Sequence, residues 1–295
     1  MLKLGVVGSS EGNGHPYSWS AILNGYNKNN MNECGYPVIS DYLSQHSLPE
    51  ESINGAKVTH VWTQERDISE HIAKSALIEN VCESLDEFVS NVDAILLARD
   101  DVQSHFDLGL PLLASGKPIY FDKPIAHNLK SLNTLFSAQK YEGQIFSCSA
   151  LRYSKQLRLT DREKEALGEI VYINCTVPNS WEKYSVHLID PIVGIFACNE
   201  QINSIQHRKF NGINESQVIW ETGLITNFSS FSDFPAKIQF DIIGKKSCKS
   251  IVWDDAFASF KSTLEVFIHQ ILTNSPKSEN THHKKVVQII EEGMK

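Results

Sequence analysis

A lysine and an acid stand directly after a short apolar segment near the middle of the chain. Residues 117–121 have the composition of a buried strand, and Asp122, Lys123 and Pro124 follow them. Ligands of open α/β sheets bind outside the carboxyl ends of the strands. We therefore expect Lys123 to point into a ligand crevice. Its ammonium group could there hydrogen-bond a substrate hydroxyl and stabilise the alkoxide that forms as hydride leaves.

A second candidate, His187, lies in an apolar segment of the second half of the chain. It follows Trp181 and Tyr184 and precedes Asp190. Histidine is the side chain best suited to move a proton near neutral pH. His187 is thus a candidate acid or base, although a capping or core histidine would give the same pattern.

A glycine-rich turn follows the first apolar segment, residues 2–7. Residues 8–14 read Gly-Ser-Ser-Glu-Gly-Asn-Gly and precede a helical pattern. Such a turn exposes backbone N–H groups, and the helix dipole favours a phosphate there. Ser10 stands where the G-x-G-x-x-G pattern has its second glycine. The turn predicts a dinucleotide site, or else a flexible turn of some other α/β protein.

The end of the second strand candidate, residues 57–62, lacks the acid that usually holds the ribose hydroxyls. Thr63 together with Arg66 could instead accept a 2′-phosphate. Alternatively, Arg66 belongs to a solvated, charged loop. The choice between NAD and NADP stays open.

The remaining histidines show no ligand pattern. His15 is expected to shape a turn with Pro16 and Tyr17, and His282 with His283 to form a solvated helix start. Neither HExxH nor a Cys/His cluster occurs, so no metal site is predicted.

Strand-like and helical segments alternate from residue 1 to about 140. The strand candidates are 2–7, 57–62, 92–98 and 117–121, and the helical stripes are Trp19–Ile22–Leu23–Tyr26, Phe106–Leu110–Leu113 and Leu129–Leu132–Phe136. This alternation predicts a Rossmann-type, doubly wound parallel sheet. Residues 27–55 form a long connection before the second strand, which could cover an adenosine or serve assembly.

The second half has clustered strands and segregated helices. The strand candidates are 170–177, 217–222, 224–231, 236–242 and 250–253, and the helices 187–198, 257–272 and 284–294. This pattern predicts an α+β domain with a largely antiparallel open sheet. With 295 residues, the chain is expected to form a dinucleotide-binding domain over 1–123 and a substrate-binding and oligomerisation domain over 124–295.

Composition narrows the partners. The net charge of −8 disfavours nucleic acid, and no apolar run is long enough to cross a membrane. The six cysteines are scattered without paired spacing, as in a reducing compartment. We expect a cytoplasmic protein with a small-molecule ligand.

Beyond these patterns, the chain resembles the glucose–fructose oxidoreductase/inositol dehydrogenase (Gfo/Idh/MocA) family. The resemblance covers nearly the whole chain and rests on Ser104-His105, Gly116-Lys117, Asp122-Lys123-Pro124, Leu151-Arg152-Tyr153, residues 167–171, and His187 with Asp190. It implies an NAD(P)-dependent oxidoreductase of carbohydrate metabolism that forms a dimer or tetramer. The substrate would be a sugar, a sugar nucleotide or a cyclitol.

The resemblance and the turn chemistry together define the expected site. Lys123 and His187 would be catalytic. The expected cofactor contacts are Gly8, Ser9, Ser10, Gly12, Asn13, Thr63, Arg66, Ala98, Arg99, Asp100, His105, Asp122 and Lys123. The expected substrate contacts are Lys123, Arg152, Tyr153, Lys183, Tyr184, His187 and Asp190.

Three departures from the family leave alternatives open. Ser10 replaces a glycine, the connection 27–55 is long, and Lys183 stands four residues before His187 where many members have an acid. Lys183 could depress the histidine pKa or bind an anionic substrate group. One alternative function uses the nicotinamide transiently without net redox change. The other is a nucleotide-binding regulatory protein without catalysis.

Overall fold

The computed structural model describes residues 1–295, which divide into two compact units. The first comprises 1–125, 134–148 and 260–278, and the second comprises 126–133, 149–259 and 279–295. Helices α8 (Leu129–Ser137) and α12 (Ala256–Leu272) each run from one unit into the other.

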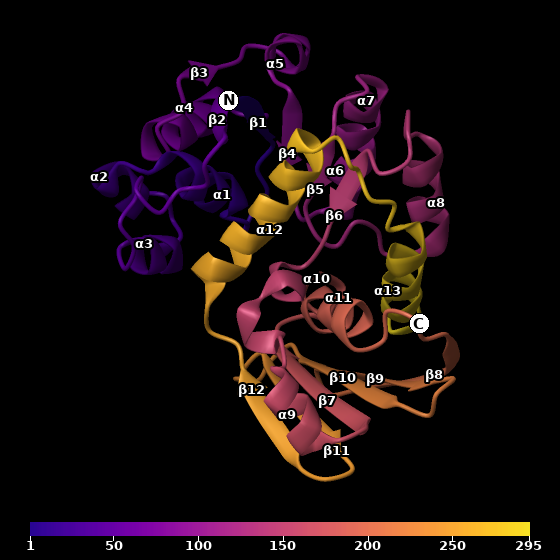
Figure 1. Ribbon diagram of the computed structural model, residues 1–295. Helices are drawn as coiled ribbons and strands as arrows, with labels where there is room; N and C mark the ends of the chain where they lie inside the picture. The colour runs from indigo at the N-terminus through magenta and orange to yellow at the C-terminus, as the bar shows by residue number, and fades with distance from the viewer. The chain divides into compact units, whose positions relative to one another are not determined.

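The first unit is built on a six-stranded sheet in the order β3-β2-β1-β4-β5-β6, with every pair parallel. Its strands are β1 (Leu2–Val7), β2 (Ala56–Trp62), β3 (Asn80–Val81), β4 (Ala94–Leu97), β5 (Ile119–Phe121) and β6 (Ile145–Ser147). This is the doubly wound order of dinucleotide-binding folds. The Rossmann-type prediction is confirmed (Figure 1).

Helices cover both faces of this sheet. The alternating side chains of β5 show this, because Tyr120 stacks on Trp19 of α1 (His15–Asn24) whereas Phe121 meets His105 of α6 (Val102–Asp107). Tyr120 also contacts Phe267 of α12. Buried strands therefore read as apolar runs, and β4 is buried at each of its residues.

The helix expected through Phe106, Leu110 and Leu113 is two helices. It breaks at Leu108, between α6 and α7 (Gly109–Ala114). Phe106 and Leu110 are only half-buried. The buried face instead begins with His105, a polar residue that a pattern of apolar side chains does not include.

The connection 27–55 contains two short helices, α2 (Lys28–Asn32) and α3 (Pro37–Leu43). Ile39 of α3 packs against Gly14 at the start of α1. The connection therefore supports the glycine-rich turn from outside.

Besides α2 and α3, four elements of this unit were not predicted from the sequence pattern. They are α4 (Arg66–Ser75), α5 (Leu85–Asn91) and the short strands β3 and β6. Strands of two or three residues are too short to show a period.

The second unit has a six-stranded sheet in the order β12-β11-β7-β10-β9-β8. The strands are β7 (Ile170–Pro178), β8 (Ile202–Phe210), β9 (Ile213–Trp220), β10 (Ile225–Phe231), β11 (Gln239–Gly244) and β12 (Cys248–Val252). Only β7 and β10 pair in parallel. The expected largely antiparallel sheet is confirmed. The edge strand β8 was missed because none of its side chains is buried and five of the nine are exposed.

Three short helical segments precede this sheet in the chain: the 3₁₀ turns Ala150–Tyr153 and Lys155–Leu157 and helix α9 (Asp161–Leu167). Helices α10 (Trp181–Tyr184) and α11 (Val186–Ile195) follow β7, and α13 (Asn280–Glu292) ends the unit. Residues of α11 and α13 join the sheet's inner side chains, such as Ile173, Phe228 and Phe240, in one apolar core. Pro191 within α11 removes the N–H that would bond the His187 carbonyl.

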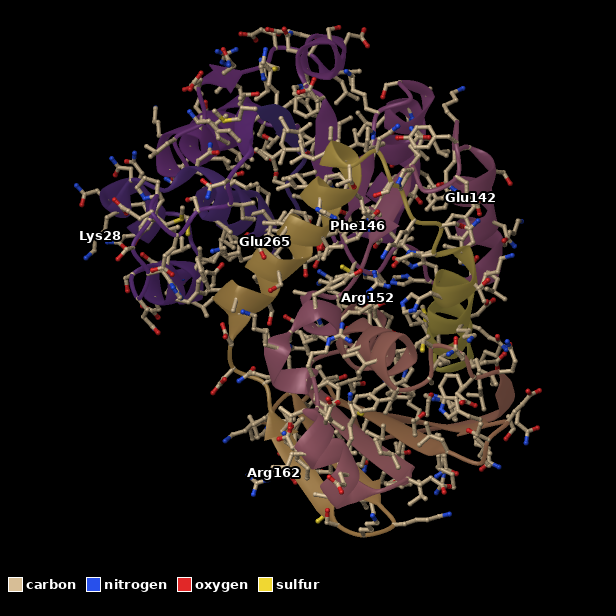
Figure 2. The ribbon with its side chains drawn as sticks, viewed as in Figure 1. Lys28, Glu142, Phe146, Arg152, Arg162 and Glu265 are labelled. Carbon is tan, nitrogen blue, oxygen red and sulfur yellow. The ribbon has the colours of Figure 1, made fainter.

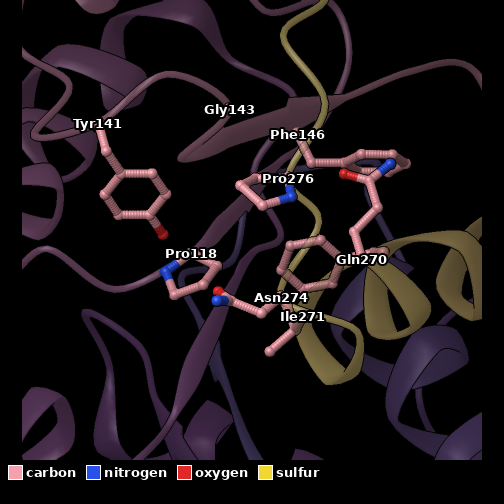
Figure 3. Close-up of a pocket in the computed structure, with 9 residues that line it drawn as sticks. Pro118, Tyr141, Gly143, Phe146, Gln270, Ile271, Asn274 and Pro276 are labelled. Carbon is pink, nitrogen blue, oxygen red and sulfur yellow. The ribbon is translucent and has the colours of Figure 1, made fainter.

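A cavity of about 250 Å³ lies at the amino ends of β5 and β6, within the first unit. Pro118, Tyr141, Phe146, Gln270 and Asn274 are among its lining residues (Figure 3). It is at the opposite edge from the carboxyl ends where Lys123 lies. None of the helices is long and apolar enough to cross a membrane.

Candidate active site

The glycine-rich turn lies between β1 and α1, at the carboxyl edge of the first sheet. Gly8 and Gly12 have φ of 84° and 78°, in the left-handed region that favours glycine. The Asn13 N–H donates to the Ser10 carbonyl at 3.1 Å, which closes the turn. A Cβ on Gly12 would meet nothing within 4 Å, so a ligand can approach the backbone there.

Side chains of this turn bond the ends of the neighbouring strands. The Ser10 hydroxyl donates to Asp100 Oδ1 at 2.8 Å, after β4. Asn13 Nδ2 donates to Asp122 Oδ2 at 2.8 Å, after β5. On the other side, the Gln64 amide pairs with the backbone of Ser9 at 3.3 and 3.1 Å. Serine at the glycine position thus fastens the turn to β4.

The first turn of α1 offers no free N–H groups. The His15 N–H donates to Asn13 Oδ1, Pro16 has none, and those of Tyr17 and Ser18 donate to the Gly14 carbonyl. A diphosphate would therefore be held by the backbone of the turn around Gly12, assisted by the helix dipole, rather than by the helix amides. With that difference, the edge fits a dinucleotide.

Asp122 is the most constrained acid of this edge. It is 1% exposed, and its oxygens accept from Asn13, from His15 Nδ1 at 2.6 Å and from the Lys123 N–H at 2.7 Å. Burial alone would raise the pKa of Asp122, but its contacts with His15, Lys123 and Asn13 hold it well below the usual range. Asp122 is thus a fixed anion that orders the groups around it.

Lys123 is 8% exposed, and its Nζ lies 4.0 Å from Asp100 Oδ2. The peptide bond to Pro124 is cis. The chain Ser10–Asp100–Lys123 connects the glycine-rich turn with the lysine. The ammonium group therefore lies at the carboxyl edge, as expected from its position after the strand.

Arg99 and His105, which both follow β4, bond other groups of the loops at this edge. The Arg99 guanidinium donates to both oxygens of Asp101, at 2.7 and 3.1 Å. His105 is fully buried, and its two ring nitrogens each lie 2.9 Å from a backbone carbonyl, those of Arg99 and Ile125. His105 thus joins the loops after β4 and β5, and its ring is not accessible to a ligand.

Ala98, also fully buried, faces the turn through its carbonyl, 3.5 Å from Asn13 Nδ2.

The end of β2 differs from the 2′-phosphate pocket that the sequence suggested. The Thr63 hydroxyl donates to the Glu65 carbonyl at 2.6 Å and contacts Ser69. The Arg66 guanidinium is paired with Glu70, at 2.9 Å, and with Glu83. A 2′-phosphate would have to compete with both carboxylates for Arg66.

In the second unit, His187 lies at the start of α11 with its Nδ1 2.9 Å from Ser149 Oγ. Ser149 is fully buried, and its Oγ already accepts from the Leu151 N–H at 3.3 Å. The Ser149 hydroxyl can accept from Nδ1–H or donate to the unprotonated nitrogen. When Nδ1–H donates to Ser149, Nε2 of the neutral ring carries the lone pair that can take up a proton.

Asp190, one turn further along α11, is the centre of a buried network. Its Oδ2 accepts from the Ser149 N–H at 2.9 Å, and its Oδ1 lies 2.6 Å from His282 Nε2 and 3.6 Å from Arg152 Nη1. Burial would raise the pKa of Asp190, but Arg152, His282 and His283 lower it. Asp190 is 1% exposed and orders side chains rather than facing a ligand.

Arg152 belongs to the same network. Its Nη2 donates to Glu279 Oε2 at 2.7 Å, and its guanidinium lies 5.1 Å from the Tyr153 ring centre. Figure 2 labels the Arg152 side chain among those of the second unit. Arg152 is 4% exposed. Lys183 is exposed and Tyr184, 5.5 Å from the His187 ring, is half-buried, so these two are better placed to meet a substrate.

The sequence did not predict the role of three histidines that lie in the buried networks of the two units. His15 was expected only to shape a turn, and His282 and His283 to be solvated. Instead, His15 contacts Asp122, His282 contacts Asp190, and His283 is buried. Burial, with the charges of His282 and Arg152, holds the pKa of His283 well below its usual value. The His15–Asp122 pair is separated by 107 positions and the His282–Asp190 pair by 92, so no local spacing could reveal them.

Comparison with known proteins agrees with this geometry. Residues 37–149 match the family model GFO_IDH_MocA, described as an oxidoreductase family with an NAD-binding Rossmann fold. The matched range contains Asp100, His105 and Lys123, but neither the turn at 8–14 nor His187. No curated protein sequence matches the chain.

Solved structures share the fold at low sequence identity. Scyllo-inositol dehydrogenase from Lactobacillus casei is 14% identical, with a TM-score of 0.73 and coverage of 99% of this chain and 96% of that one. Myo-inositol 2-dehydrogenase from Lactobacillus plantarum is 12% identical, with a TM-score of 0.74 and the same coverage. A 3-ketoreductase from Actinomadura kijaniata, in complex with TDP-benzene and NADP, is 12% identical, with a TM-score of 0.73 and coverage of 98% and 96%.

The family match and the shared fold confirm the resemblance read from the sequence. Residues 37–149, which include Lys123, carry the match to the Gfo/Idh/MocA family of oxidoreductases.

Proposed function

We propose that the protein is an NAD(P)-dependent oxidoreductase that transfers hydride between the nicotinamide and a carbon bearing a hydroxyl or carbonyl group. The observation that carries this proposal is Lys123, held beside Asp100 at the carboxyl edge of a doubly wound sheet. A cation at this edge can stabilise the oxygen on which negative charge develops. The family match supports the same reaction class.

The chain's own residues would orient the reactants and handle the proton. When bound, the nicotinamide supplies hydride transfer. The turn at 8–14, Asp100 and Lys123 would hold the dinucleotide, and Lys123 would also bond the substrate oxygen. His187 would exchange a proton with that oxygen through Nε2, because Ser149 occupies Nδ1.

The proposed substrate is a sugar, a sugar nucleotide or a cyclitol. The similar structures include dehydrogenases named for scyllo- and myo-inositol and a ketoreductase with TDP-benzene bound. Of the expected substrate contacts, Tyr153, Lys183 and Tyr184 remain the best candidates, since Asp190 and Arg152 are buried in ion pairs. Lys183 could bind an anionic group of such a substrate.

Binding and turnover test the proposal separately. Calorimetry should show that NAD or NADP binds the unsubstituted protein, and a panel of cyclitols and nucleotide sugars should identify a substrate by NAD(P)H absorbance. Lys123→Met and His187→Ala should each lower kcat by about two or more orders of magnitude, and His187→Ala should leave nucleotide affinity nearly unchanged. Lys140→Met, at an exposed position, is the matched control.

Three results would redirect the assignment. Absence of binding for both dinucleotides would exclude it. Full activity in Lys123→Met and His187→Ala would remove these two residues from the mechanism. Absorbance of bound NADH that rises and decays without net release would indicate transient use of the nicotinamide instead.

A further inference from the structure

His15 is the first residue of α1, and its ring is held on several sides. It stacks on Trp19 with a centroid distance of 4.8 Å and an interplanar angle of 11°, and Phe260 meets it edge-on at 5.1 Å. Its Nδ1 lies 2.6 Å from Asp122 Oδ2. The imidazole therefore has one orientation, fixed by two aromatic rings and a carboxylate.

The partner of Nδ1 decides where the ring can act. An ionised carboxylate only accepts hydrogen bonds, so Nδ1 carries the proton and donates it to Asp122. The other nitrogen, Nε2, points away from Asp122 and has no hydrogen-bond partner in the protein. The side chain is 15% exposed. An oriented imidazole whose outer nitrogen is accessible is built to contact a ligand, as in other Asp–His pairs.

The position of the pair selects the part of the ligand. Sheets of this order bind a dinucleotide across the carboxyl edge, with the end of β2 beside the ribose that carries the 2′ group of NAD or NADP. Asp122 follows β5, on the other side of β1 and β4 from β2. A residue fastened to Asp122 therefore faces the nicotinamide half of the dinucleotide.

We propose that His15 Nε2 hydrogen-bonds a hydroxyl of the nicotinamide ribose. A ribose hydroxyl both donates and accepts, so it can pair with the neutral or the protonated ring. The contact would supplement a phosphate site in which the amides of the first turn of α1 are already engaged. This inference rests on the proposed dinucleotide binding and adds to it a residue that neither the glycine pattern nor the Asp-Lys-Pro motif indicates.

The test compares ligands that contain or lack this ribose. His15→Phe keeps a ring beside Trp19 and loses both nitrogens, while His15→Gln can keep a donor to Asp122. Calorimetry would measure NAD, ADP-ribose and ADP, or their 2′-phosphorylated forms if the protein prefers NADP. Both variants should bind the dinucleotide and ADP-ribose about tenfold more weakly, and ADP as the unsubstituted protein does. His269→Gln, on the exposed side of α12, is the control.

Several outcomes would overturn the inference. These are unchanged dinucleotide affinity, an equal loss for ADP, which would indicate collapse of the turn, or a loss for the dinucleotide but not for ADP-ribose. If neither variant folds, nitrogen NMR of the histidine-labelled, unsubstituted protein decides instead. One ring with Nδ1 protonated should change its Nε2 shift on addition of ADP-ribose but not of ADP, and the absence of such a ring would refute the contact. Failure of the unsubstituted protein to bind any dinucleotide would instead overturn the proposed function itself.

Discussion

The hydroxyl of Ser149 and Nδ1 of His187 lie 2.9 Å apart, and this contact engages Nδ1 and leaves proton exchange to Nε2. The same serine uses its backbone N–H to bond Asp190. Ser149 therefore joins the proposed proton-transfer residue to a buried anion. Neither the serine nor its role follows from the residues next to His187 in the chain.

Ser149→Ala should leave His187 with a free choice of tautomer. We expect kcat to fall by about tenfold with KM nearly unchanged, because the substrate still binds but meets a ring that is less often in the active form. The pH dependence of kcat should shift as well. Ser149→Thr keeps the hydroxyl and should restore most of the activity. An unaltered pH profile in Ser149→Ala would contradict the role given to Ser149.

Asp190→Asn should destabilise the second unit. The substitution leaves Arg152 and His282 without their shared carboxylate in a buried site, which costs about 3 kcal/mol. Urea unfolding of the variant would measure this loss. Asp161→Asn, which removes a fully exposed partner of Lys164, should change stability little. Equal losses of unfolding free energy in the two variants would mean that the buried network contributes no more to stability than an exposed ion pair.

Low pH should reduce the free energy of unfolding through Asp190 and Asp122. The folded state lowers the pKa of both carboxyls relative to the unfolded chain. Their contribution is therefore complete above the ordinary aspartate pKa and is lost as pH falls through the lowered values. The unfolding free energy should decline from about pH 4 downward. In Asp190→Asn this decline should be shallower, and an unchanged slope would argue against the assignment.

Gly8→Ala should mainly lower stability, whereas Gly12→Ala should mainly lower dinucleotide affinity. Both place a side chain at positive φ, which costs about 1–2 kcal/mol. At Gly8 the new Cβ would also lie 2.6 Å from Arg99 Cδ, so this variant should be the less stable in urea. At Gly12 the Cβ meets no protein atom but occupies the ligand side of the turn. Gly12→Ala should therefore lose more dinucleotide affinity in calorimetry, and the reverse order would exclude a ligand above Gly12.

Glu83→Gln should increase the affinity for NADP relative to NAD. The substitution removes one of the two carboxylates that engage Arg66 and makes the guanidinium more available to a 2′-phosphate. Calorimetric titration with both dinucleotides gives the ratio. Glu79→Gln, which removes a partner of Lys57 instead, should leave the ratio unchanged. An unaltered ratio in Glu83→Gln would place Arg66 outside the cofactor site.

The sequence predicted the parts of the molecule that depend on neighbours along the chain. Strands such as β4 and the helix starting near Pro16 follow from local apolar spacing, and Lys123 follows from its place after a strand. The partners of these residues could not be predicted in the same way. His15 meets Asp122 and Ser149 meets His187 only after the sheets have formed, and such contacts leave no spacing signal.

Two of the expected substrate contacts are engaged with each other in the structure. Arg152 and Asp190 were expected to bind substrate because polar side chains near a candidate catalytic histidine usually face the ligand. In the fold they neutralise each other inside the second unit. Charge alone does not distinguish a binding residue from a buried ion pair, because that distinction depends on solvent access.

The division of the chain into interleaved segments limits how the protein can be taken apart. Residues 134–148 and 260–278 complete the first unit although they come after residues 126–133 of the second. A fragment ending at Lys123 would lack β6 and the buried Phe267 of α12, and a fragment starting at Pro124 would carry both without their partners. During synthesis, the strands of the first sheet leave the ribosome with the first half of the chain, but the first unit cannot be completed until residues 260–278 have followed.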